Sequence, residues 1–203
     1  MNDQYYTREP QSESHRIPCN FNYRGHLLRF ETDSGVFSKG ELDDGTKLLL
    51  DSLPETLSGQ VVDMGCGWGA IGVTLGKTWK DAHITMCDVN LRALDLCRDN
   101  AAKNGVTNVE ILESSGFDAI RDRRFDFVIT NPPIRAGKQV IYQMFADAAN
   151  QLTENGELYL VIRKQQGAES CMKYLKTLFE NVERIARDNG FWILRASGAV
   201  VKE

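Results

Sequence analysis

The chain has 203 residues, of which 42% are hydrophobic and 26% are charged, and its formal net charge is −4. This composition is that of an ordinary globular domain and disfavours disordered, collagen-like and membrane-embedded classes. The negative net charge argues against a protein that coats nucleic acid by charge alone, although a local basic face remains compatible with it.

The sequence also predicts the cellular environment. No apolar run approaches the roughly 18 residues of a membrane span, and the first residues lack the apolar core of a signal peptide, so we expect a cytoplasmic protein. The five cysteines are scattered, with no C-x-x-C pair, and we expect reduced, mostly buried thiols. The three histidines are scattered as well, and we expect no metal site.

The first part of the chain is predicted to form an extension. About a dozen polar residues come first, and two alternating runs between Arg16 and Thr32 then flank Arg24-Gly25, which predicts a β-hairpin. A glycine-punctuated loop follows. Asp43 or Asp44 is suited to cap a helix that continues through Leu53, where a proline ends it.

From Gln60 onward, short apolar runs alternate with segments of helical periodicity. This alternation predicts βαβ units and an α/β fold with a mainly parallel sheet covered on both faces. Asn189-Gly190 between the last two strand-like runs predicts an antiparallel hairpin at one edge. We therefore divide the chain into an N-terminal extension, residues 1–53, packed on a core domain, residues 54–203. The expected strands are 60–64, 83–89, 108–112, 125–130, 157–162, 182–188 and 191–197, and the expected helices are 70–79, 91–104, 140–152 and 168–179.

The first candidate site is the run from Val61 to Ala70, where a buried strand turns into a helix. Its glycines allow a tight turn and close approach of the backbone to a ligand, and Gly65, Gly67 and Ala70 match the weak dinucleotide pattern G-x-G-x-x-G/A. Asp63, two places before the first glycine, would repel a pyrophosphate but suits the cationic amino group of a methionine moiety. The run therefore favours a sulfonium cofactor.

The second candidate site is Asp88, at the end of the next predicted strand and about 20 residues beyond the glycine loop. A carboxylate at that spacing can accept both hydroxyls of a ribose. Asn90 is a good cap for the helix that follows.

The third candidate site is Asn131-Pro132-Pro133-Ile134, directly after a strand. Two prolines make a stiff exit at the carboxyl edge of the sheet, where open α/β folds bind ligands. The Asn131 side-chain oxygen and the Pro132 carbonyl can accept the two hydrogens of an amine, and so aim its lone pair at a methyl donor. Two acceptors also stabilise the positive charge that develops on a poorly nucleophilic nucleobase nitrogen.

Together these motifs resemble class I methyltransferases that act on exocyclic amines. More closely, the runs SGVFSKGELDDGTKLLL, TNPPIRAGK and RKQQGA are similar to those of the ribosomal RNA small subunit methyltransferase C family and its single-domain relatives. The resemblance implies a Rossmann-like, seven-stranded, mostly parallel sheet with an antiparallel last strand. It also implies S-adenosylmethionine as the cofactor, the 2-amino group of guanine as the target, and ribosomal RNA or the small ribosomal subunit as the partner.

The resemblance further implies roles for individual residues. A loop containing Phe37, Ser38 and Lys39 is expected to close over cofactor and substrate. Arg135 and Lys138, in an acid-free stretch, are expected to contact substrate. The implied cofactor-binding residues are Asp63, Gly65, Cys66, Gly67, Gly69, Asp88, Val89, Ser115, Asn131, Phe37 and Lys39, and the implied catalytic residues are Asn131, Pro132, Pro133 and Ile134.

Two positions depart from the wider pattern and keep alternatives open. Ile134 stands where many amine methyltransferases have an aromatic that stacks on the base, and Ser115 stands where an acid often contacts the cofactor adenine, so that backbone groups or Asp118 are equal candidates. Methylation of adenine or of a protein glutamine fits the same acceptors. A catalytically silent RNA-binding module and, from the glycine loop alone, a nicotinamide or flavin oxidoreductase are the other hypotheses.

Overall fold

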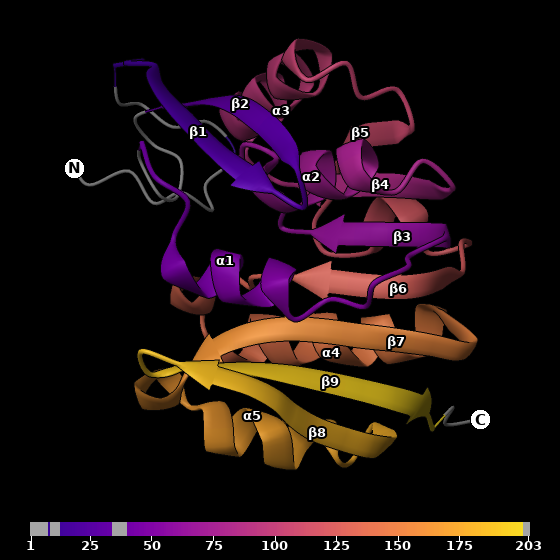
Figure 1. Cartoon of the computed structure of the whole chain (residues 1–203). Helices are drawn as coiled ribbons and strands as arrows, with labels where there is room; N and C mark the ends of the chain where they lie inside the picture. Colours follow the sequence, from indigo (N-terminus) through magenta and orange to yellow (C-terminus); the bar gives the residue numbers. More distant parts are fainter. Residues whose placement is uncertain (1–7, 9–12, 34–39, 201–203) are drawn as a thin grey trace.

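A seven-stranded sheet in the order β5-β4-β3-β6-β7-β9-β8 organises the molecule (Figure 1). The computed structural model describes residue 8, residues 13–33 and residues 40–200. The strands are β3 (Gly59–Met64), β4 (Ala82–Asp88), β5 (Val109–Glu113), β6 (Phe125–Thr130), β7 (Leu152–Arg163), β8 (Phe179–Asp188) and β9 (Phe191–Ala199). No helix in these residues is long and apolar enough to span a membrane.

The strands β3 to β7 run parallel, and β9 lies antiparallel between β7 and β8. Asn189 and Gly190 join the last two strands with φ of 45° and 79°, the left-handed pair that a two-residue hairpin turn requires. The predicted sheet, its reversed last strand and its edge hairpin are therefore confirmed.

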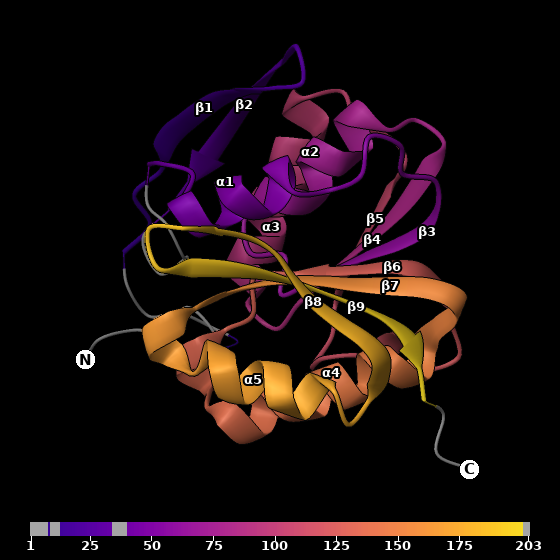
Figure 2. The same cartoon turned by 60° about the horizontal axis from the view of Figure 1, so that its bottom comes forward.

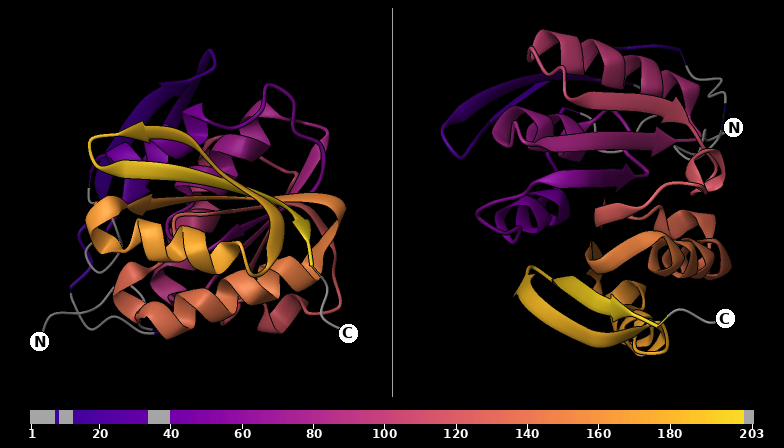
Figure 3. Two further views of the ribbon diagram at one scale, coloured as in Figure 1. Left: turned by 90° about the horizontal axis from the view of Figure 1, so that it is seen from below. Right: turned by 90° about the vertical axis from the view of Figure 1, so that its right-hand side faces the viewer.

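Helices cover both faces of the sheet (Figures 2 and 3). On one face lie α1 (Asp44–Asp51), α2 (Ala70–Thr78) and α3 (Leu91–Lys103), and on the other lie α4 (Lys138–Gln151) and α5 (Ala168–Leu175). Successive strand residues point to opposite faces, so the fully buried Val61 and Val62 belong to two separate core clusters. Three short 3-10 helices, η1 (Asp118–Ile120), η2 (Ile134–Ala136) and η3 (Lys164–Gln166), connect elements.

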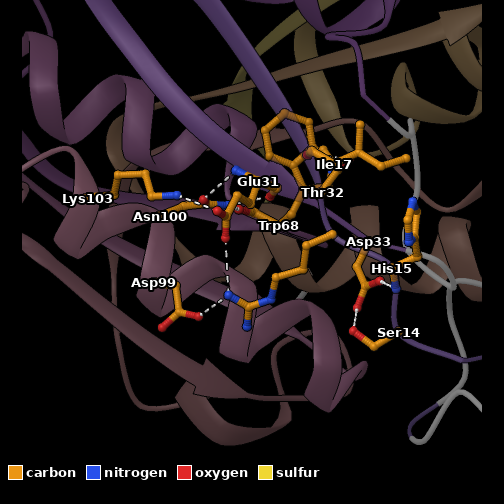
Figure 4. Close-up of polar contacts among 11 residues, drawn as sticks. Ser14, His15, Ile17, Glu31, Thr32, Asp33, Trp68, Asp99, Asn100 and Lys103 are labelled. Atoms are coloured by element: carbon orange, nitrogen blue, oxygen red, sulfur yellow. Dashed lines mark hydrogen bonds and ion pairs between the residues drawn. The ribbon is translucent and has the colours of Figure 1, made fainter.

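The predicted N-terminal hairpin is present as β1 (Ile17–Tyr23) and β2 (His26–Thr32), paired antiparallel. It packs on α3 through the buried side chain of Asn100, whose Oδ1 accepts from the Glu31 N–H at 2.8 Å while Nδ2 donates to the carbonyls of Glu31 and Trp68 at 2.9 and 2.8 Å (Figure 4). The Glu31 carboxylate also pairs with Lys103 at 2.8 Å. Asn100 thus ties the hairpin to the glycine loop.

Arg24, at the tip of this hairpin, stabilises the packing of the hairpin on the core. Its guanidinium lies 4.9 Å from the Trp79 ring centroid and donates to the carbonyls of Leu53, Pro54 and Glu55. The segment after α1 is thereby fixed against the hairpin.

Most element boundaries lie within two residues of the prediction, but β7 and β8 begin five and three residues early and α5 ends four residues early. The helix α1 ends at Asp51, two residues early, because its last turn tightens: the backbone N–H groups of Ser52 and Leu53 donate to the carbonyls three residues back, Leu49 and Leu50. The strand β7 begins at Leu152, five residues early, because an irregularity in its pairing with β6 lets the extra residues join the sheet.

Candidate functional site

The glycine loop turns β3 into α2 at the carboxyl edge of the sheet. Gly65, Gly67 and Gly69 have φ of 74°, 54° and 97°, which side chains rarely adopt. The backbone N–H groups of Gly65 and Cys66 donate to the Cys87 carbonyl at 2.8 and 2.9 Å, which ties the loop to β4. Apart from Gly67 and its two chain neighbours, no atom of the described residues lies within 4 Å of the position that a Cβ on Gly67 would take, so this residue leaves space open.

Asp63 lies beneath the loop and is fully buried. Its Oδ2 accepts from the Gly72 N–H at 2.8 Å, whereas Oδ1 has no hydrogen-bond partner among the described residues. Burial, opposed by the Gly72 hydrogen bond and reinforced by the nearby Asp88, raises the pKa of Asp63 to about 7.

Asp88 stands at the end of β4 and faces the glycine loop. Its Oδ2 accepts from the Gly67 N–H at 2.8 Å and its Oδ1 from the Asn90 N–H at 2.9 Å. Burial raises the pKa of Asp88, and these backbone hydrogen bonds oppose that rise. A carboxylate has about four lone-pair sites, so each oxygen keeps capacity for a further donor such as a hydroxyl.

The thiol of Cys66 belongs to the same glycine loop but is not a nucleophile. A hydrogen bond with Cys97 and burial hold its pKa well above the usual range, so it stays protonated at neutral pH. All five cysteines are free and buried, which confirms the predicted burial of these thiols.

The segment after β6 makes a rigid turn at the same edge. Pro133 has φ −73° and ψ 78°, and the Ile134 N–H donates to the Pro132 carbonyl at 2.8 Å, which together form an inverse γ-turn. A carbonyl has two lone pairs, so the Pro132 oxygen can still accept one more hydrogen.

The side chain of Asn131 is held by the start of α1. Its Nδ2 donates to the Thr46 Oγ1 at 3.0 Å, and that hydroxyl donates to the Asp43 Oδ2 at 2.5 Å. Asp43 is also the N-cap of α1, because its Oδ1 accepts from the Thr46 N–H at 3.1 Å. The capping role predicted for Asp43 or Asp44 thus falls to Asp43.

One cavity of about 800 Å³ brings the three motifs together. Asp63 and Gly69 lie behind its wall, and Ile134, Arg135 and Lys138 lie outside it, with the Lys138 ammonium 5.0 Å from the Tyr142 ring centroid. Phe37, Ser38 and Lys39 fall outside the described residues. The predicted site residues that line the cavity are Gly65, Cys66, Gly67, Asp88, Val89, Ser115, Asn131, Pro132 and Pro133.

Sequence reasoning missed two parts of this wall. Asp43 was interpreted only as a cap and Thr46 not at all, because their approach to Asn131 exists only in the folded chain. The exposed face of α4 was missed too, and Val140 on this face is 55% exposed in the structure. The missed lining residues include Asp43, Thr46, Gln139, Val140, Gln143 and Asp147.

A second hollow, of about 790 Å³, lies where β7, α5 and the β8–β9 turn meet. Its cationic side chains are Arg163, Lys164 and Lys173, and its one acid is Glu169, 3.9 Å from the Lys164 ammonium. The Arg163 guanidinium lies 4.3 Å from the Phe191 ring centroid, and that ring packs against Gly45 of α1. Phe191 thus lies between Arg163 of this hollow and the start of α1, where Asp43 and Thr46 line the first cavity.

Known proteins are similar to this chain in sequence and in fold. Residues 27–195 match the family model described as the methyltransferase small domain. The chain is 42% identical over 198 residues to the uncharacterized protein YbxB of Bacillus subtilis (strain 168), which covers 97% of this chain and 98% of that one.

Two further matches are longer proteins. Ribosomal RNA small subunit methyltransferase C of Vibrio vulnificus (strain CMCP6) is 35% identical over 183 residues, covering 87% of this chain and 51% of the relative. The structure of the T. thermophilus 16S rRNA N2 methyltransferase RsmC, in complex with AdoMet and guanosine, has a TM-score of 0.81 at 24% identity and covers 93% of this chain and 51% of that one. The chain spans about half the length of these two proteins.

Proposed function

The chain belongs to the family of methyltransferase small domains, and from that premise we propose that it transfers a methyl group from S-adenosylmethionine to the 2-amino group of a guanine in ribosomal RNA. The observation that carries this proposal is the single cavity shared by the glycine loop, Asp88 and Asn131-Pro132. A methyl donor and a planar amine can meet there.

The residues present fit the cofactor. The space beside Gly67 admits an adenosyl group, and the free acceptor capacity of Asp88 suits the ribose hydroxyls. The orphaned Asp63 Oδ1 beneath the loop suits the cationic amino group of the methionine moiety. When bound, S-adenosylmethionine supplies an activated methyl on a sulfonium.

The chain's own part in the reaction is to position the amine and stabilise charge. Asn131 Oδ1 and the remaining Pro132 lone pair accept the two amine hydrogens and hold the nitrogen lone pair toward the methyl group. As the nitrogen–carbon bond forms and the sulfur–carbon bond breaks, both oxygens stabilise the positive charge that grows on nitrogen. The extra proton then leaves to water, so no strong base is required.

The choice of substrate rests on the relatives and on one residue. Two of the similar proteins are named as ribosomal RNA methyltransferases, and one of those is an N2 methyltransferase. Ile134, directly after Pro133, lies outside the cavity and has no aromatic face, which disfavours a site built on stacking of a free base. We place the RNA phosphates against the exposed side chains of Arg135 and Lys138.

Mass spectrometry of ribosomal RNA nucleosides tests the proposal. RNA from cells that lack the gene should contain one methylguanosine fewer than RNA from the parent, and a plasmid copy should restore it. Loss of a methyladenosine, or of methylation on a protein glutamine, would move the activity to one of the other amines. Unchanged RNA and protein methylation would contradict the proposed activity.

A further inference from the structure

We propose that Asp43 and Thr46 are positioning residues that fix the direction of the Asn131 side-chain amide, so that its oxygen faces the substrate amine. The inference rests on the proposed function and adds a part of the site that the three sequence motifs do not contain. The three residues form a hydrogen-bonded chain from the start of α1 to the exit of β6.

The direction in which these hydrogen bonds run follows from the chemistry of Asp43. An aspartate side chain at neutral pH is a carboxylate and only accepts hydrogen bonds, so the Thr46 hydroxyl must give its single hydrogen to Asp43. Thr46 then has only lone pairs to offer Asn131, and the group that Asn131 turns toward it must be the NH₂. The Asn131 oxygen is consequently left for the cavity.

The orientation matters because the two ends of an asparagine amide have nearly the same shape and opposite hydrogen-bonding character. With the NH₂ end inward, the site would present a donor to the amine hydrogens and repel them. With the oxygen inward, Asn131 and the Pro132 carbonyl form the pair of acceptors that methyl transfer needs.

The first turn of α1 holds the Asp43 and Thr46 hydrogen bonds rigidly. Thr46 is 3% exposed, so water competes little for its hydroxyl. A Cβ on Gly45 would lie 2.7 Å from the Phe191 ring, and the absence of that atom lets the first turn of α1 pack directly on the start of β9. Both oxygens of Asp43 are engaged, one by the Thr46 N–H and one by the Thr46 hydroxyl.

A purely structural role for these contacts is the competing explanation, since Asp43 caps α1. Thr46→Val separates the two roles, because it keeps the shape of the side chain and the capped backbone N–H but removes the hydroxyl. Thr46→Ser restores the hydroxyl. The matched control is Thr74→Val in α2, which removes an equally buried hydroxyl that donates to the Ala70 carbonyl and does not line the cavity.

We expect Thr46→Val to lower kcat for methyl transfer to ribosomal RNA roughly 10- to 100-fold, since a misaligned reacting group costs about that much. The KM for RNA, the Kd for S-adenosylhomocysteine and the urea midpoint should stay close to the parent values. Thr46→Ser and Thr74→Val should retain most of kcat. Loss of kcat in Thr46→Val that merely follows a lower urea midpoint, or is matched by Thr74→Val, would overturn the proposal.

Asp43→Asn gives a second test. Asparagine caps helices as well as aspartate does, but it has one oxygen and cannot accept from both Thr46 groups through separate oxygens. We expect kcat to fall with little change in stability. Unchanged kcat in Asp43→Asn would contradict a directional role for the carboxylate.

Nuclear magnetic resonance can detect the Asn131–Thr46 contact without measuring methyl transfer. The side-chain NH₂ resonances of Asn131, assigned by their loss in Asn131→Ala, should shift in Thr46→Val and in no comparable way in Thr74→Val. If the parent enzyme methylates no RNA, the proposed function fails while these resonances still report the contact. If they do not move in Thr46→Val, the positioning chain is absent whatever the activity.

Discussion

The fully buried Asp63 places an ionisable group beneath the glycine loop, with one oxygen lacking a partner among the described residues. Burial raises its pKa from 3.8 to about 7, so that the folded, cofactor-free protein holds a proton that the unfolded chain releases. At pH values between 3.8 and about 7, the folded state binds more protons than the unfolded state. The free energy of unfolding must therefore fall as the pH rises through this range.

We predict that Asp63→Asn removes this pH dependence. The free energy of unfolding of the parent should fall by up to about 4 kcal/mol relative to the variant between pH 4 and pH 7, and the difference should level off above pH 7. Urea unfolding of the cofactor-free proteins at several pH values measures it. Asp95→Asn, which changes an exposed side chain, is the control. Its free energy of unfolding should follow that of the parent at every pH. A parallel curve for Asp63→Asn would show that Asp63 titrates in its ordinary range.

At the scale of elements, α3 joins the hairpin to the site. Asn100 and Asn104 both bond to the backbone of β2, through Glu31 and Arg29 respectively, but only Asn100 also donates to the Trp68 carbonyl in the glycine loop. The hairpin therefore supports the cofactor side of the cavity through one buried amide.

The two asparagines give a matched pair of variants. Asn100→Ala and Asn104→Ala should each lower the free energy of unfolding by about 2 to 4 kcal/mol, because each leaves buried polar groups without a partner. Only Asn100→Ala should in addition weaken S-adenosylhomocysteine binding, by about 10-fold, since it frees the glycine loop. Calorimetric titration of both variants checks this. Equal losses of affinity would show that the loop does not depend on the Trp68 contact.

The elements show what sequence can and cannot predict here. Buried apolar runs and the Asn189-Gly190 turn were sufficient for the parallel strands and the edge hairpin, because local periodicity carries that information. The three motifs line one cavity because they follow parallel strands, whose carboxyl ends meet at the same edge of the sheet. Thr46 could not be found in this way, since its contact with Asn131 joins positions 85 residues apart. The early start of β7 depends on its irregular pairing with β6 and was missed as well.

Over the whole molecule, a net charge of −4 coexists with a cationic hollow beside the cavity. Lys164 and Lys173 are exposed there, and Arg163 of the same hollow packs on Phe191, which contacts Gly45 at the start of α1. A strand of RNA whose base enters the cavity can continue along this hollow with its phosphates against the lysines.

Lys164→Ala combined with Lys173→Ala should accordingly weaken RNA binding and flatten its salt dependence, with a loss of about 1 to 2 in the slope of log K against log salt. Affinity for S-adenosylhomocysteine should not change. Arg124→Ala combined with Lys176→Ala removes two exposed cations that line neither hollow and serves as the control. Equal salt slopes in the two double variants would place the RNA elsewhere.

We propose that Asn131 and the Pro132 carbonyl hold a planar amine in front of a bound methyl donor. Single-turnover transfer of labelled methyl from S-adenosylmethionine to ribosomal RNA of cells lacking the gene tests it most directly, with Asn131→Ala compared with the parent. The parent should label guanine, and Asn131→Ala should bind S-adenosylmethionine with similar affinity but lose transfer by at least about 100-fold. Transfer at the parent's rate by Asn131→Ala would show that Asn131 does not hold the reacting amine.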